Sequence, residues 1–282
     1  MSSSIAGPLT DPDELAQHLG RPGVVVLDVR RGERFATAHL PGARHFSVYG
    51  INTYDTDEAS LQSFVRMWAF QLSLAGIRRD DTVVVCGDYS DEPAARAYWF
   101  LRYLGHPECA LLDGGLTGWA RAGHQTEQAA AVPLPTSYRY TVVDALVANW
   151  RQAGAAGLDA TAVLLDTRSD EEWYGHDGRG AERAGAMPGA VHLEWTHHLG
   201  EDGRFKSPRM LSALFADIGA TPSAPVVAYC NTGYRSAHAC LALELAGHVP
   251  ARNYVDSWQE WGNRADCRVV RPSSGGGAAP LA

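Results

Sequence analysis

The chain has 282 residues, of which 45% are hydrophobic and 20% charged, a composition typical of a globular protein with one large domain or two ordinary ones. The formal net charge of −8 argues against a nucleic-acid or membrane-surface partner, because either would call for a basic patch. Five scattered cysteines without CxxC spacing favour a reducing compartment over a disulfide framework.

The start of the chain, MSSSIAGPLTDPDEL, has no basic segment followed by an apolar one, so we expect no secretory signal there. No apolar run reaches the roughly 20 residues that a membrane-spanning helix needs. We therefore expect a cytoplasmic protein.

Short apolar runs alternate with helical patterns along the whole chain. The runs at 23–29, 80–86, 162–167 and 223–230 are rich in valine and lack polar alternation, which predicts buried parallel strands. The patterns at 92–106 and 235–248 predict helices that end at Gly105 and Gly247. This alternation predicts an α/β fold with a mainly parallel sheet flanked by helices.

The chain also repeats itself at long range. VVVLDVR (24–30) resembles AVLLDTR (162–168), LPGARHF (40–46) resembles MPGAVHL (187–193), and LGHPECALLDGGLTGW (104–119) resembles AGHVPARNYVDSWQEW (246–261). Repeats this long predict two similar domains rather than a solenoid. We expect a first domain at 1–128, a linker at 129–140, a second domain at 141–270 and a flexible tail at 271–282.

One cysteine lies at the carboxyl end of a predicted parallel strand, where active sites of α/β proteins form. Cys230 follows the apolar run at 223–230, at the carboxyl end of a predicted strand, and a short loop then turns into a helix. Such a loop can direct backbone N–H groups and the positive end of the helix at a thiolate, and Arg235 adds a positive charge. We expect Gly233 to supply a positive φ or a close approach. The predicted cradle around the sulfur comprises Asn231, Thr232, Gly233, Tyr234 and Ser236.

The first copy serves as an internal control for this loop. Over the last third of each copy the offset is a constant 142 residues, which aligns Cys230 with Asp88 and Arg235 with Pro93. The first domain therefore lacks the nucleophile. The alternative to a catalytic role is that of a buried structural cysteine. This interpretation applies best to Cys86, Cys109, Cys240 and Cys267.

In this order and in both halves, the motifs resemble the tandem-domain rhodanese family of sulfurtransferases. They are LLDxR, HLPGA (39–43), AMPGA (186–190), LDGGLTGW (112–119), YVDSWQEW (254–261) and CNTGYR (230–235). The resemblance implies two rhodanese-like domains, with catalysis through a Cys230 persulfide in the second. Ala186 and Asp256 depart from the family's usual histidine and glycine, and CNTGYR matches neither the CRKGVT loop of thiosulfate enzymes nor the CGSGVT loop of mercaptopyruvate enzymes.

The reaction implied by the resemblance moves a sulfane sulfur from thiosulfate or 3-mercaptopyruvate to cyanide, a thiol or a protein acceptor, and needs no metal or organic cofactor. Thiosulfate is slightly favoured. An anionic donor calls for a guanidinium, and the insert at 175–185, found only in the second copy, offers Arg183 and Arg179. The family also allows His39 to face the site.

Two other functions stay open at this stage. A carrier that delivers sulfur to a dedicated protein partner would use the same loop. A cysteine phosphatase would need C-x5-R, and only four residues separate Cys230 from Arg235. Arg168 of LLDTR, which has a counterpart in Arg30, is expected to pair locally with a carboxylate, and the adjacent His197 and His198 lack metal-site spacing.

Overall fold

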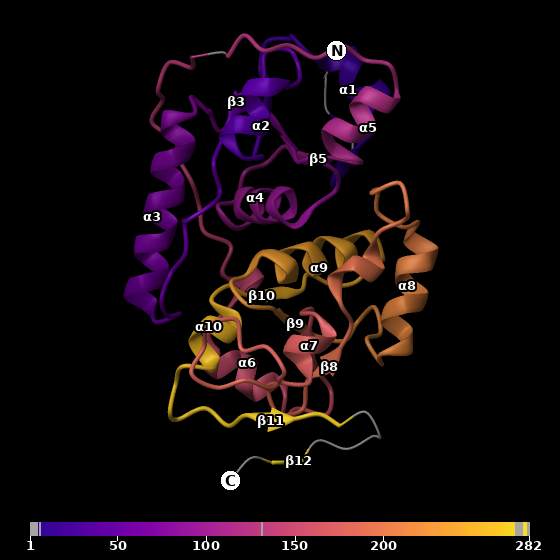
Figure 1. Cartoon of the computed structure of the whole chain (residues 1–282). Helices are drawn as coiled ribbons and strands as arrows, with labels where there is room; N and C mark the ends of the chain where they lie inside the picture. Colours follow the sequence, from indigo (N-terminus) through magenta and orange to yellow (C-terminus); the bar gives the residue numbers. More distant parts are fainter. Residues whose placement is uncertain (1–4, 6, 131, 274–278, 281–282) are drawn as a thin grey trace. The chain divides into compact units, whose positions relative to one another are not determined.

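The computed structural model describes residues 5, 7–130, 132–273 and 279–280 (Figure 1). The chain forms two compact units, each with one five-stranded sheet. The first unit comprises residues 1–51, 62–144 and 199–205, and the second comprises 52–61, 145–198 and 206–282. Each unit thus contains a short segment from the other half of the chain, which the contiguous predicted domains did not anticipate. The predicted linker 129–140 lies within the first unit.

The first unit has a fully parallel sheet in the order β1-β5-β4-β2-β3. Its strands are β1 (Leu9–Thr10), β2 (Val24–Asp28), β3 (Arg44–His45), β4 (Thr82–Cys86) and β5 (Cys109–Leu112). Its helices are α1 (Pro12–His18), α2 (Gly32–Thr37), α3 (Glu58–Leu74), α4 (Glu92–Tyr103) and α5 (Gly115–Arg121), with the first residues of α3 assigned to the second unit.

The second unit repeats this order as β6-β10-β9-β7-β8, again parallel throughout. Its strands are β6 (Val147–Ala148), β7 (Val163–Asp166), β8 (Val191–His192), β9 (Val226–Tyr229) and β10 (Arg252–Tyr254). Its helices are α6 (Trp150–Ala156), α7 (Asp170–Trp173), α8 (Pro208–Asp217), α9 (Tyr234–Leu245) and α10 (Ser257–Trp261), and short 3-10 turns occupy Asp144–Leu146 and Trp195–His198.

The predicted flexible tail carries some structure where it is described. Arg271 ends β11 (Val270–Arg271), which pairs antiparallel with β12 (Ala279–Pro280). The rest of the predicted tail, at 274–278 and 281–282, lies outside the described residues.

Local signals in the sequence explain the element boundaries. The valine-rich runs are buried strands, as their lack of polar alternation predicted. α6 and α7 both begin with capping boxes, in which a cap side chain and the third helical residue exchange hydrogen bonds. Gly105 and Gly247 have φ values of +66° and +82° directly after the C-caps of α4 and α9, so both predicted helix stops are confirmed.

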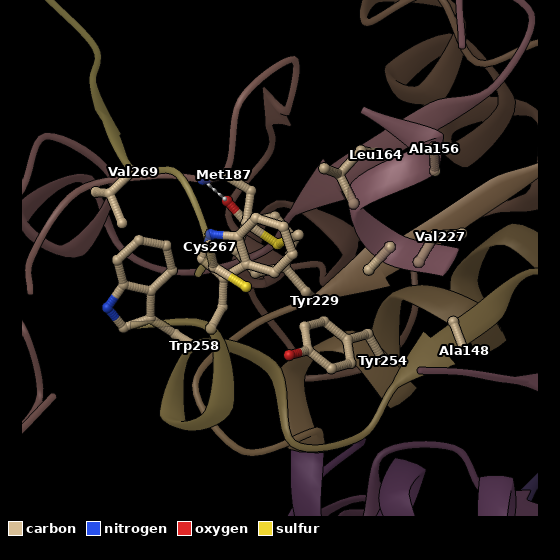
Figure 2. Close-up of a cluster of buried hydrophobic side chains, with 12 residues drawn as sticks. Ala148, Ala156, Leu164, Met187, Val227, Tyr229, Tyr254, Trp258, Cys267 and Val269 are labelled. Carbon is tan, nitrogen blue, oxygen red and sulfur yellow. Dashed lines mark hydrogen bonds between the residues drawn. The ribbon is translucent and has the colours of Figure 1, made fainter. Parts of the chain in front are cut away.

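Each unit has its own hydrophobic core. In the second unit, residues from the strands pack with Trp258 and Trp261 of α10 and with Cys267. Figure 2 shows Tyr229 and Trp258 in this cluster, with the backbone N–H of Met187 donating to the Tyr229 hydroxyl at 3.2 Å. Tyr229 and Trp258 directly adjoin Cys230 and Ser257 in the chain, so the core holds the neighbours of both residues in place. Among the described residues, no helix combines the length and apolar character needed to cross a bilayer.

Candidate active site

The short loop between β9 and α9 places Cys230 under a converging set of donors. Its side chain is 1% exposed, and its Sγ accepts the backbone N–H of Gly233 at 3.1 Å. The Ser236 hydroxyl, in the first turn of α9, lies 3.5 Å from the same sulfur. Hydrogen bonds from N–H and O–H groups favour a thiolate over a thiol.

Gly233 is the N-cap of α9 and has φ +82°. A Cβ there would overlap the Val255 carbonyl and lie 3.0 Å from the Val255 Cα. Both predicted reasons for a glycine, positive φ and close approach, therefore hold at this position.

The electrostatics of the loop single out one cysteine. Burial alone would raise the pKa of the Cys230 thiol, but the charge of Arg235 and hydrogen bonds from Ser236 and the Thr232 backbone outweigh it and lower the pKa. Burial raises the pKa of Cys86 and Cys240, and that of Cys267 to about 11. The predicted direction for Cys230 is confirmed, and its thiol is set apart from these three.

Arg235 reaches the site from the first turn of α9 and is bound to a carboxylate. Its two terminal nitrogens donate to Glu172 of α7 at 2.5 and 2.9 Å. Both side chains are largely buried, at 16% and 3% exposed. The guanidinium is therefore anchored rather than free in solvent.

Ser257, which sequence reasoning did not select, lies beneath the cysteine. Its Oγ accepts the Cys230 backbone N–H at 2.9 Å and donates to the Tyr254 carbonyl at 2.5 Å, and it is 4.0 Å from Sγ. Ser257 is one of two non-glycine residues in the described part of the chain with positive φ, at +52°. A backbone conformation of this kind costs about 1–3 kcal/mol and persists only where other contacts hold it. The hydrogen bonds of the Ser257 hydroxyl are contacts of this kind.

The first unit shows what the same fold looks like without the thiol, and it corrects one alignment. Asp28 pairs with Cys86 in the first sheet, and its equivalent Asp166 pairs with Tyr229 in the second. The residue equivalent to Cys230 is therefore Gly87, not Asp88 as the constant offset predicted. The loop that leads to α4 is one residue longer than the loop that leads to α9.

A carboxylate occupies the first unit's loop. Asp91, the N-cap of α4, accepts the backbone N–H groups of Asp88 at 2.9 Å and Ala94 at 3.1 Å. A Cβ at Gly87 would lie 2.7 Å from the Asp91 carboxyl carbon. The acidic side chain thus fills the space in which a cysteine side chain would begin.

Arg183, one of the two arginines predicted to bind a substrate, makes its contacts within the second unit. Its guanidinium donates to the carbonyls of Gly262 at 3.1 Å, Trp261 at 3.0 Å and Cys267 at 2.6 Å, and also to that of Arg264. All three nitrogens of the guanidinium thus tie the insert to the end of α10 and the segment after it. An arginine used in this way offers few N–H groups to an anionic donor.

His39, which the family resemblance allows to face the site, makes its contacts within the first unit. His39 is fully buried within the first unit, stacks on Phe35 at a 3.9 Å centroid distance, and contacts the carbonyls of Phe35 at 2.8 Å and Ala129 at 3.4 Å. Both ring nitrogens are occupied by backbone oxygens. The residue joins α2 to the segment after α5.

The remaining predicted site residues are exposed or half-buried. Arg179 is exposed with φ +48°, and within the described residues its guanidinium has no partner. Asn231, Thr232 and Tyr234 are half-buried. The Asn231 amide oxygen is buried and has no hydrogen-bond partner among the described atoms.

The LLDxR arginines behave as expected. Arg168 forms a bidentate pair with Asp166, at 2.6 Å for the shortest contact, and donates to the Gly185 carbonyl. Arg30 repeats the pair with Asp28 at the same distance. In the described part of the chain, no group of three His, Cys, Asp or Glu side chains could hold a metal ion.

The fold and the cysteine loop together define a class of protein with paired α/β domains, of which the second holds a buried thiol whose pKa is lowered. The family model for the Rhodanese-like domain matches residues 11–122 and 151–264. The chain belongs to this family.

Similar proteins cover nearly the whole chain. The putative thiosulfate sulfurtransferase SseA of Mycobacterium bovis is 34% identical over 93% of this chain and 90% of its own length. The sulfur carrier protein TtuD of Thermus thermophilus is 32% identical over 93% of this chain and 96% of its own. The crystal structure of SseA from Escherichia coli, a 3-mercaptopyruvate sulfotransferase, has a TM-score of 0.77 and 23% identity, over 90% of this chain and all of that one, and it supports the fold alone.

Proposed function

We propose that this protein is a sulfurtransferase that carries a sulfane sulfur on Cys230. The observation that supports this most directly is the buried Cys230 sulfur, which accepts the Gly233 N–H and has a lowered pKa. Membership of the Rhodanese-like family and relatives named as thiosulfate sulfurtransferases point the same way.

In the first half-reaction the Cys230 thiolate attacks the outer sulfur of thiosulfate. The sulfur–sulfur bond of the donor breaks, sulfite leaves with its electron pair, and Cys230 becomes an anionic persulfide. With 3-mercaptopyruvate the carbon–sulfur bond breaks instead, and pyruvate leaves after its enolate takes up a proton. The loop N–H groups and the Ser236 hydroxyl stabilise the negative charge in both states.

In the second half-reaction an acceptor attacks the outer sulfur of the persulfide. Cyanide becomes thiocyanate, or a thiolate becomes a persulfide, and the Cys230 thiolate is regenerated. The protein itself undergoes no net oxidation. Loop donors suffice for these steps, so we propose no metal or organic cofactor.

We propose thiosulfate as the slightly preferred donor and leave Arg179 as the candidate arginine, because its exposed guanidinium is free to meet an anion. The Arg179→Ala variant should then raise the KM for thiosulfate, because it removes a charge-assisted hydrogen bond. Equal KM values for the variant and the wild type would leave the donor without an arginine from this insert.

A mass measurement tests the central step. Incubation with thiosulfate or 3-mercaptopyruvate should add the mass of one sulfur atom, and cyanide should remove it. Cys230→Ser should abolish the adduct, whereas Cys109→Ser, at the half-buried cysteine of the first unit, should keep it. An adduct that persists in Cys230→Ser would place the sulfur on another cysteine.

A second candidate function is a sulfur carrier for a dedicated protein acceptor, favoured by the similarity to TtuD. The two functions differ in the second half-reaction. A persulfide that small thiols and cyanide discharge slowly, but that a protein acceptor discharges fast, would support the carrier. Rapid turnover with cyanide would support the enzyme.

A further inference from the structure

The Glu172 side chain is a buried carboxylate close to the thiol loop that the mechanism above does not use. Glu172 is the third residue of α7, and its carboxylate also accepts the backbone N–H of Ser169 at 3.2 Å, as part of the capping box. Burial opposes its ionisation, but the hydrogen bonds and charge of Arg235 outweigh burial and hold the pKa of the carboxyl below its usual value. The helix start therefore holds a charged carboxylate at a fixed point.

The partner of this carboxylate, Arg235, acts on the sulfur through its charge. Arg235 stands in the chain between Gly233 and Ser236, which both direct donor groups at the Cys230 Sγ. After burial, the positive charge of Arg235 is the largest influence on the pKa of the Cys230 thiol, and it lowers that pKa. The other charges that act on the pair are Arg168, near Glu172, and Asp166, near Arg235.

The first unit indicates that the fold itself does not require a carboxylate at this position. By the LLDxR alignment the equivalent of Glu172 is Arg34, which has the opposite charge and pairs with Asp88 at 2.8 Å. The equivalent of Arg235 is Pro93. The glutamate and the arginine therefore occur together only in the unit that carries the thiol.

We propose that Glu172 is a positioning residue that holds the Arg235 guanidinium beside the Cys230 sulfur. This inference rests on the proposed function for its biological meaning, because a cation fixed at this point would favour both the thiolate and the persulfide of the transfer cycle. The bidentate contact occupies two N–H groups of the guanidinium. Arg235 then acts as a fixed charge for the sulfur rather than as a clamp for the donor.

The test compares four variants of the full chain: Glu172→Gln, Arg235→Met, the double variant, and Glu171→Gln as a matched control. Glu171 is the exposed neighbour of Glu172 on the same helix. The readout is the rate at which iodoacetamide alkylates the Cys230 peptide as a function of pH, followed by mass spectrometry. Far-UV circular dichroism during thermal unfolding reports whether each variant is folded.

We expect Glu172→Gln to raise the pKa of the thiol and to slow alkylation at pH 7 by about three- to tenfold, because the amide cannot hold both guanidinium nitrogens. Arg235→Met should slow it at least as much, and the double variant no more than Arg235→Met. Glu171→Gln should match the wild type. If Glu172→Gln does not fold, Arg235→Lys, which keeps the charge but cannot bind both oxygens, should still raise the pKa.

Two outcomes would overturn the inference. Unchanged or faster alkylation in folded Glu172→Gln would mean that the carboxylate screens the guanidinium or acts only in the helix cap. Additive losses in the double variant would mean that Glu172 acts independently of Arg235. Alkylation does not depend on sulfur transfer, so a wild-type protein that takes no sulfur from any donor would refute the proposed function and leave this result intact.

Discussion

Ser257 offers a test that separates backbone strain from the chemistry of a hydroxyl. Ser257→Ala removes the oxygen and keeps the Cβ at φ +52°, whereas Ser257→Gly removes the oxygen and relieves the strain. Both variants leave the buried Cys230 N–H and the Tyr254 carbonyl without the partners that now lie at 2.9 and 2.5 Å. An unsatisfied buried group costs about 1–3 kcal/mol, so with two such groups each variant should be less stable than the wild type by about 2–6 kcal/mol.

In an ordinary helical position glycine is less stable than alanine, but at Ser257 we expect the reverse order of stability. A left-handed backbone costs a non-glycine residue about 1–2 kcal/mol, which Ser257→Gly recovers. Glycine also makes the unfolded chain more flexible, which lowers stability by about 0.4–1 kcal/mol. Ser257→Gly should therefore equal or exceed Ser257→Ala in stability by up to about 1 kcal/mol. Urea unfolding, compared at equal m-values, measures the difference.

Alkylation of Cys230 should follow a different pattern from stability. If the hydroxyl positions the cysteine, Ala and Gly variants should lose reactivity equally. A loss of reactivity in Ser257→Ala alone, with Ser257→Gly near the wild type, would assign the effect to backbone strain and refute the role of the hydroxyl. A matched control is Gly115→Ala in the first unit, where φ is +55° and an added Cβ would lie 2.6 Å from the Gly87 carbonyl; it should destabilise the protein without changing the Cys230 rate.

Three further predictions follow from single contacts. Arg183→Ala should lower the free energy of unfolding by about 2–4 kcal/mol, because it removes a donor from four carbonyls, of which those of Trp261 and Arg264 also accept a backbone N–H. A stable variant with an altered KM for the sulfur donor would contradict the structural role. Thr56→Val should lower the free energy of unfolding by about 1–3 kcal/mol. It removes the hydroxyl that donates to Glu260 at 2.7 Å and accepts the Trp150 N–H at 2.9 Å. A urea midpoint equal to that of the wild type would contradict this prediction. Burial and the neighbouring His238 lower the pKa of His198 in the fold, so the unfolded chain binds the extra proton first, and stability should fall as pH drops below the unfolded value of about 6.5; His198→Phe should flatten that slope, and an unchanged slope would refute the assignment.

The sequence predicted what local pattern controls. Valine-rich runs, helix stops at Gly105 and Gly247, and a cysteine at a strand end all depend on residues close together in the chain. The fold class and its duplication follow from the same signals. The lowered pKa of Cys230 was predictable because its causes, a helix start and Arg235, lie within a few residues of it.

The sequence did not reveal contacts that no short pattern encodes. Arg183 reaches carbonyls 78 to 84 residues further along the chain, and a long side chain in a glycine-rich insert gives no sign of such partners. The mistaken match of Cys230 with Asp88 arose because the extra residue lies within the loop, so the helices on its far side still align. The role of Ser257 depends on its φ value, although Gly115 at the matching position was a usable hint.

The exchanged segments have a consequence for how this protein can be divided. Residues 52–61 belong to the second compact unit and residues 199–205 to the first, so no single cut in the chain separates the two. A gene fragment for residues 145–282 would lack Thr56, and Glu260 would lose two of its donors. The two halves are thus better suited to complementation, as fragments produced together, than to independent expression.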